Sequence, residues 1–282
     1  MKVIEVSCFL FFCICAIIDS LTILTLSQSM LGLQDNLPSS FQWDVIKTLI
    51  GSFAGAFLAF ISNQYFQNKA ISRDNLSAGY RALFLIRSQL DDFLNVRRAM
   101  YKSLDDINTK LNGEPEWVLA KPISYDFNSS NVFDYKSLAF LLSIQSGREV
   151  FTRLQLAERA YLDLMSGLSE FNESALEKQK KMATSQLGEN NFASLGEIER
   201  YIGVELVART RDQLRGIVVK LAHDESRYIK AFESLNRVLV EIFCPDYEVQ
   251  KIVIQERHAI AQLPNLPDNL KKHVAEQNID IE

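Results

Sequence analysis

The sequence is poor in the residues that cross-link small domains or bind structural metals: it has 4 cysteines and 3 histidines in 282 residues. Three of the cysteines lie in one N-terminal apolar stretch, where thiols behave as small hydrophobic groups, and Cys244 lies outside it. This count excludes a disulfide framework and fits a reducing cytoplasmic compartment. No CxxC or HExxH spacing surrounds the histidines, so the sequence predicts no zinc site and no cofactor.

Glycine is also scarce, at 11 residues, and neither a phosphate-binding glycine loop nor a GxSxG motif is present. The sequence therefore predicts a protein that is not an enzyme. One tripeptide, His223-Asp224-Glu225, has side chains suited to acid–base chemistry, because a carboxylate can orient a histidine. The same residues also fit the boundary between two helices, and the pattern favours that interpretation.

Long apolar runs occur only at the N-terminus, about residues 6–26 and 45–62. Each approaches the ~20 residues that a helix needs to cross a bilayer. A cleaved signal peptide is the alternative for the first run, but only Lys2 precedes it and no small-x-small cleavage site follows it. We therefore predict a transmembrane hairpin in residues 1–63.

Basic residues predict the orientation of this hairpin. The connection between the two runs has no Lys or Arg, whereas Lys69 and Arg73 follow the second run. Basic residues stay on the cytoplasmic side. The sequence thus predicts a multi-pass protein of the bacterial inner membrane with both termini in the cytoplasm.

The second run contains small residues at every fourth position: Gly51, Gly55 and Ala59. On a helix they form one smooth face, which lets another helix approach closely in lipid. The pattern predicts self-association through this span, or packing against the first span of the same chain; it does not choose between them.

The first run is interrupted by Asp19, and Thr22 lies on the same helical face. A carboxylate at membrane depth costs a few kcal/mol and usually faces protein or water. Two interpretations remain open: a polar seam along a water path or subunit contact, or a helix that ends early near the headgroups.

The remainder of the chain predicts an all-α fold: a long stalk-like helix over 64–111, then a cytoplasmic helical bundle to residue 263, then a polar tail over 264–282. Apolar spacing and capping residues place the later helices. The expected helices are Phe133–Leu142; Arg148–Phe171 with Phe151, Leu154, Leu162 and Met165 inward; Ser194 to about Ala222; Asp224–Phe243; and one from Pro245 that ends before Pro264. The charged stretch Glu177–Lys181 is expected to be solvated.

Charge does not point to nucleic acid. Residues 64–282 include 28 basic and 31 acidic residues, and the two kinds are interspersed along the sequence. Contact with RNA phosphates is one interpretation of Arg209, Arg211 and Arg215, but acidic residues share their helix, so the pattern favours a neutral solvated face. We predict no direct binding of nucleic acid.

The hairpin with Gly51 and Gly55, the basic flank Lys69/Arg73 and the charged helical domain resemble the two-transmembrane effector proteins of bacterial retron antiphage systems. The resemblance implies a non-enzymatic effector of the bilayer. A partner complex of a reverse transcriptase with its RNA–DNA product would hold it inactive. Release would let it damage the membrane and arrest growth. The alternative is a membrane-anchored helical scaffold or sensor that binds a cytoplasmic protein.

Overall fold

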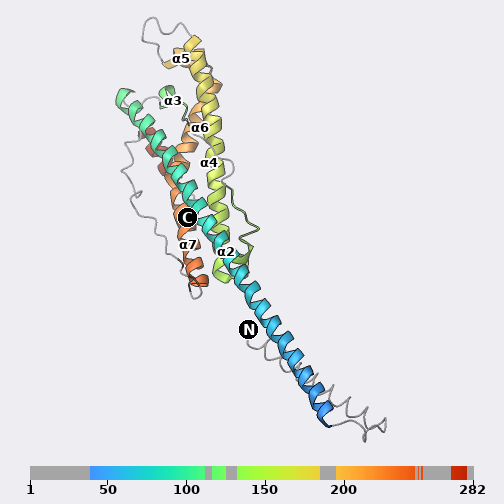
Figure 1. The fold of residues 1–282 in the computed structure, drawn as a ribbon. Helices are drawn as coiled ribbons and strands as arrows, with labels where there is room; N and C mark the ends of the chain where they lie inside the picture. Colours follow the sequence, from blue (N-terminus) through green and yellow to red (C-terminus); the bar gives the residue numbers. More distant parts are fainter. Residues whose placement is uncertain are drawn as a thin grey trace. The chain divides into compact units, whose positions relative to one another are not determined.

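The chain is described here by a computed structural model, which covers residues 39–111, 116–124, 132–184, 195–244, 247, 249 and 268–277. Its regular elements are all helical, in agreement with the predicted all-α class, and the described residues contain no strand (Figure 1). The elements are α2 (Ser39–Leu111), α3 (Glu116–Leu119), the 3₁₀ helix η1 (Ala139–Ser143), α4 (Gln145–Thr184), α5 (Leu195–Ile202), α6 (Val204–His223), α7 (Glu225–Phe243) and α8 (Asp268–Gln277).

The chain divides into two compact units, Met1–Ala70 and Ile71–Glu282, called unit 1 and unit 2 below. Helix α2 contributes residues to both units. The second predicted span, 45–62, falls within α2. The first predicted span, with Asp19 and Thr22, lies outside the described residues.

The part of α2 in unit 2 buries one face in the core, as its apolar period predicts. The buried positions recur three or four residues apart. Of the two arginines that interrupt this apolar pattern, Arg87 is exposed and Arg97 is mostly buried. Buried members of this face are Ala78, Ala82, Leu83, Ile86, Leu90, Phe93, Leu94, Val96, Met100, Tyr101 and Leu104.

Helix α4 is 40 residues long, ~60 Å at helical rise, and continues well beyond the predicted end at Phe171. Leu154 and Met165 are buried as predicted, but the inward placement of Leu162 is wrong, since its side chain is exposed. The prediction of a fully solvated stretch at 177–181 is also wrong, because Lys178 is only 1 % exposed.

Polar side chains of α4 hold two non-helical segments by their backbones. Glu158 accepts a hydrogen bond from the Phe133 N–H at 2.6 Å and another from the Tyr135 hydroxyl at 2.8 Å. Asn172 pairs with both backbone groups of Ile123, accepting from its N–H at 2.8 Å and donating to its carbonyl at 2.9 Å. These bonds satisfy buried backbone groups that no helix can pair.

Lys178 holds a third segment, the end of α3. Its ammonium donates to the carbonyls of Trp117, Val118 and Ala120 at 2.6, 3.1 and 2.8 Å. Burial lowers the pKa of Lys178 to about 8. The three carbonyls oppose that shift, because only the protonated amine has three hydrogens to donate. One turn further along α4, Lys181 donates to the carbonyl of Ile202 at 3.0 Å and caps α5.

The helix predicted from Ser194 to about Ala222 is interrupted. Gly203 separates α5 from α6 with a φ of 99°, a left-handed conformation that glycine adopts without steric cost. The helix predicted over Phe133–Leu142 is limited to η1, because Asp134 and Ser137 form a local turn in which the Ser137 hydroxyl donates to the Asp134 carbonyl at 2.9 Å.

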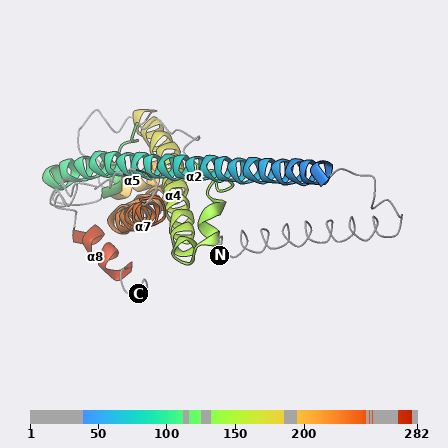
Figure 2. The ribbon, with the colours of Figure 1, turned by 60° about the horizontal axis from the view of Figure 1, so that its bottom comes forward.

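Helix α7 has the predicted extent. In the helix expected after Pro245, the described residues Tyr247 and Val249 are not helical. Within the predicted polar tail, α8 forms and buries Leu270 completely against the core. Figures 1 and 2 show α4 and α7 on one side of the later part of α2.

Helices α2 and α7 approach each other closely at Gly79 of α2. A Cβ at this position would lie 2.4 and 2.8 Å from the two terminal methyl groups of Leu239 in α7, and Leu239 is fully buried. A side chain at this position would have to displace the Leu239 methyl groups, so glycine suits the close approach of the two helices.

We expect Gly79→Ala to lower the free energy of unfolding by about 1–3 kcal/mol, because a packed core yields little to an added methyl group. Leu239→Ala destabilises by itself, but it empties the contested space, so Gly79→Ala should cost less free energy in a Leu239→Ala background than in the wild-type chain. Gly216→Ala in α6 is the matched control: no described atom lies within 4 Å of its added Cβ, and helix propensity should stabilise by about 0.5–1 kcal/mol. Circular dichroism of the detergent-solubilised chain during unfolding measures all three; equal effects at residues 79 and 216 would contradict the close approach.

Candidate functional site

The first candidate is an apolar stretch of α2 in unit 1. Among the described residues, α2 is the one helix long and apolar enough to cross a membrane, within Lys47–Asp105, and none of its most apolar window is buried. No charged residue occurs between Lys47 and Lys69. The intervening helix, 48–68, rises ~30 Å, about the thickness of a bilayer core. Its exposed large apolar side chains are Leu49, Ile50, Phe53, Leu58, Phe60, Ile61, Tyr65 and Phe66.

The predicted packing residues share one face of this stretch. Gly51, Gly55 and Ala59 are all exposed, and successive members turn by ~40° around the helix. No heavy atom of the described residues lies within 4 Å of a Cβ added at either glycine. As far as the described residues extend, the small-residue face is therefore open to an approaching helix.

The ends of the stretch carry polar groups suited to an interface. The Lys69 ammonium lies 5.9 Å from the centroid of the Tyr65 ring, one turn away. Lys69 and Arg73, the predicted flanking basic residues, are both exposed. Inside the stretch, the Ser52 hydroxyl donates to the Thr48 carbonyl at 3.2 Å, so this polar group is satisfied within the helix.

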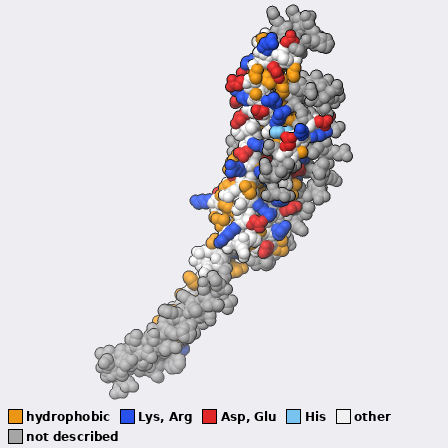
Figure 3. Space-filling model, turned by 180° about the vertical axis from the view of Figure 1, so that it is seen from behind, with side chains coloured by type: hydrophobic (Ala, Val, Ile, Leu, Met, Phe, Trp, Pro, Cys, Tyr) orange, Lys and Arg blue, Asp and Glu red, His pale blue; other side chains and the backbone are white. Residues whose placement is uncertain are grey.

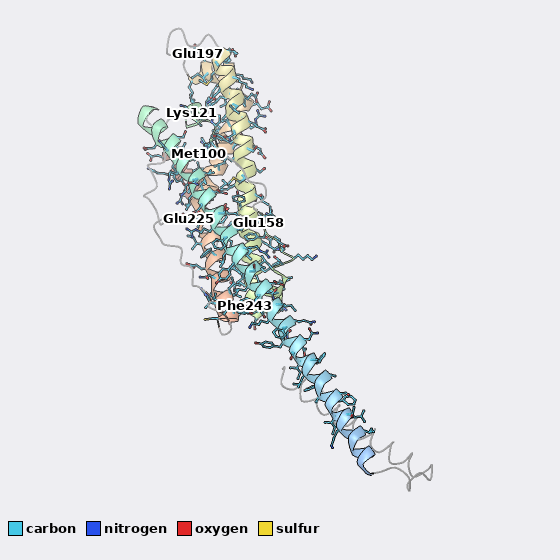
Figure 4. The ribbon with its side chains drawn as sticks, viewed as in Figure 1. Met100, Lys121, Glu158, Glu197, Glu225 and Phe243 are labelled. Carbon is cyan, nitrogen blue, oxygen red and sulfur yellow. The ribbon has the colours of Figure 1, made fainter. Side chains whose placement is uncertain are left out.

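The second candidate is a polar layer inside unit 2, where α2, α4 and the α6–α7 junction meet. The Tyr161 hydroxyl of α4 donates to the Asp92 carboxylate of α2 at 2.9 Å. Arg97 of α2 forms an ion pair with Glu225, the first residue of α7, and its guanidinium lies 5.9 Å from the Phe93 ring centroid. Figure 4 shows Glu225 where α2 and α7 run side by side.

Two tyrosine hydroxyls in this layer are buried without a hydrogen-bond partner among the described residues, those of Tyr101 and Tyr228. Burial raises the pKa of Tyr101 to about 12; Arg97 opposes this rise and Glu225 adds to it. Burial also raises the pKa of Tyr228, and the Asp224 carboxylate adds to that rise. Both hydroxyls therefore stay protonated at neutral pH, and each is an unmet polar group in the core.

The tripeptide His223-Asp224-Glu225 lies in this layer, but its side chains point to different partners. Glu225 pairs with Arg97, and Asp224 pairs with Arg227 at 2.9 Å. The His223 Nε2 atom is buried with no partner among the described residues. Asp224 occupies the N-cap position of α7 as predicted, yet its side chain makes no capping hydrogen bond. The histidine–carboxylate pair that acid–base chemistry needs is not formed.

Two of the three arginines considered for RNA contact, Arg209 and Arg211, lie beside acidic residues. Arg209 pairs with Glu177 of α4 at 2.8 Å, and Arg211 lies 3.5 Å from Asp212. Acidic and basic side chains are interspersed over the face of unit 2 in Figure 3. The described residues contain no group of three or more His, Cys, Asp or Glu that could hold a metal ion.

Comparison of the chain with protein-family models, with characterised proteins and with solved structures gives no match. Its function is therefore argued from its own residues. The sequence pointed to the first candidate through hydropathy and spacing. Of the polar layer it pointed only to the tripeptide 223–225, since Asp92, Arg97 and Tyr161 are brought to it by the packing of separate helices.

The Arg97–Glu225 pair should contribute more than a surface ion pair, because both side chains are less than a fifth exposed. Arg97→Met leaves Glu225 partly buried without its cation, and we expect a loss of about 1–3 kcal/mol. A double-mutant cycle with Glu225→Gln should show positive coupling. The exposed pair Arg209–Glu177 is the control, with an expected coupling below about 1 kcal/mol. Similar coupling at both pairs, measured by chemical unfolding in detergent, would refute this expectation.

Proposed function

We propose that this chain is a non-enzymatic effector of the bacterial inner membrane that acts in antiphage defence. A partner complex holds it inactive, and triggering lets it damage the membrane and arrest growth. Its transmembrane part is a two-helix hairpin with both termini in the cytoplasm. The polar helical unit then lies in the cytoplasm.

One observation carries the membrane part of this proposal: the charge-free apolar stretch of α2 has no buried residue in its most apolar window. The role in defence rests on the resemblance of the hairpin and its basic flank to retron effectors. A helix that exposes Phe53, Leu58 and Phe60 to water would aggregate, so it needs lipid or another apolar helix around it. The stretch has the length of a bilayer core and carries a tyrosine and a lysine at one end, as membrane helices do at the interface.

The small-residue face supports self-association as the triggered step. In lipid, helices associate by close packing, because the hydrophobic effect does not act between them. Gly51, Gly55 and Ala59 form an exposed strip of small residues at which two α2 backbones can approach each other. A pure anchor has no need of such a face. Asp19 and Thr22 of the first span supply the polar groups that a lesion between subunits needs.

The proposed partner is a protein complex, a reverse transcriptase with its RNA–DNA product, and unit 2 is the part that it contacts. The mixed charge of unit 2 and the engagement of Arg209 and Arg211 with carboxylates favour contact through the protein and not through the nucleic acid. A reverse transcriptase gene next to this one would support this choice of partner.

Expression of the chain without its partner should depolarise the membrane and stop growth, and Gly55→Leu should abolish both effects. The leucine fills the face on which a second helix packs, while the helix stays apolar enough to insert. Ala56→Leu is the matched control, because it adds a comparable side chain about 100° away from Gly55 and should keep the activity. The readouts are a membrane-potential dye, growth, and recovery of both variants in the membrane fraction.

The effector function would be refuted if cells that express the wild-type chain at a high level kept normal growth and normal membrane potential. The same result must hold under phage challenge with the native neighbouring genes present. If an unrelated two-span anchor in place of residues 1–63 preserved activity, the chain would be the scaffold or sensor and its spans would only tether it.

The orientation can be tested with the exposed thiol of Cys244, which lies at the end of α7. A membrane-impermeant maleimide should label it only after the inner membrane is opened. Cys244→Ser controls for the cysteines of the first span. Labelling of Cys244 in spheroplasts with intact membranes would place unit 2 outside the cytoplasm and overturn the proposed topology.

A further inference from the structure

Asp224 is the one residue between α6 and α7. Asp224 has helical angles, φ −79° and ψ −14°, and its N–H bonds to the Lys220 carbonyl at 2.9 Å, as in an α-helix. The next bonds depart from that pattern: the Arg227 N–H bonds to the Asp224 carbonyl at 3.0 Å, and the Ser226 hydroxyl donates to the His223 carbonyl at 3.4 Å. Neither glycine nor proline is present, so these tighter local bonds account for the break.

The carboxyl group of Asp224 is buried, and its polar contacts make up for little of the solvation that it loses. Its residue is 5 % exposed, and the partner shown for its side chain is the Arg227 guanidinium, which is half-exposed. Burial raises the pKa of Asp224, while Arg227, Lys220 and His223 oppose the rise and Asp163 adds to it. The ionised form therefore carries a desolvation cost that its neighbours do not cancel.

The elements packed around Asp224 supply both signs of charge. Lys220 of α6 is directed to the backbone of α4, where its ammonium donates to the Asp163 carbonyl at 2.9 Å. The fully buried Tyr228 hydroxyl has no partner among the described residues. The titratable and charged groups of this layer are Asp92, Arg97 and Tyr101 of α2; Tyr161 and Asp163 of α4; Lys220 and His223 of α6; and Glu225, Arg227 and Tyr228 of α7.

We propose that the α6–α7 junction is a proton-linked hinge whose opening is controlled by the Asp224 carboxyl group. When this carboxyl is ionised, opening the junction admits water to the charge and recovers its solvation. When it is protonated, that gain disappears and the junction stays closed. The hinge lies within unit 2 and does not depend on the membrane function proposed above.

The direction of the pH dependence follows from the raised pKa. The closed junction binds the Asp224 proton more tightly than the open junction does, because the carboxyl in water has its ordinary pKa. Closure is therefore most favourable below the ordinary pKa. It weakens as the pH rises through the interval between the ordinary and the raised value.

Amide hydrogen exchange of the full chain in detergent micelles tests the hinge. Exchange is measured from pH 4 to 8, and the exchange times are corrected for the pH dependence of the intrinsic exchange rate. A peptide that covers 216–232 should lose protection as the pH rises, about tenfold for each unit by which the pKa is raised. In the Asp224→Asn variant this loss of protection should disappear, and the peptide should stay as protected at high pH as it is at low pH. Asp212→Asn, the same change at an exposed aspartate of α6, should keep the wild-type transition.

Constant protection of the wild-type peptide across this pH range would overturn the hinge, and so would an unchanged transition in Asp224→Asn. If that variant does not fold, Arg227→Gln provides the second test. Removing the cation raises the pKa of the carboxyl further, so the transition should move to higher pH. A transition that does not move in Arg227→Gln would also overturn the hinge.

Discussion

The arrangement of unit 2 depends on hydrogen bonds between α4 side chains and the backbone of four other segments. Two of these segments are not helical, and the other two are the C-terminal ends of the short helices α3 and α5. Glu158, Asn172, Lys178 and Lys181 each satisfy backbone groups of a different segment. A buried backbone N–H or carbonyl without a partner costs about 1–3 kcal/mol. These four side chains remove that cost and fix the segments against a long, straight helix. The apolar core can then close around α4 without further regular structure.

Lys178 and Asp224 show two outcomes for a buried charge. All three donors of Lys178 are used by carbonyls, and each bond is 3.1 Å or shorter. Asp224 has the half-exposed Arg227 guanidinium as the partner shown for its side chain, and the buried Tyr228 hydroxyl has no partner among the residues that the structure describes. A satisfied charge makes the core rigid, whereas an unsatisfied one marks where it can open. This contrast places the hinge at the α6–α7 junction and not at the end of α3.

The sequence predicted what depends on local period. The seam of α2 through Leu83, Leu90 and Leu94 and the extent of α7 follow from apolar residues three or four apart. It did not predict the burial of Lys178. The charged neighbours of Lys178 in the sequence suggest a solvated face, whereas in the fold three carbonyls from distant residues enclose its ammonium. The rest of the polar layer was missed for the same reason, since Asp92 and Tyr161 are 69 residues apart. The small-residue face was visible because it needs only spacing within one helix.

In both units, side chains lie in an environment that does not match their polarity. Such a mismatch marks a place where a change of state gives those side chains a better environment. In unit 1 the mismatch is apolar: α2 exposes phenylalanine and leucine side chains along a charge-free stretch, which lipid or a second helix would cover. In unit 2 the mismatch is polar: a carboxylate is buried at a helix break, and water or a proton would relieve it. Residues that only maintain a fold are selected to avoid such costs, because a stable domain has only a few kcal/mol to lose. Keeping both mismatches in one chain therefore favours a protein that changes state over one that only anchors a domain.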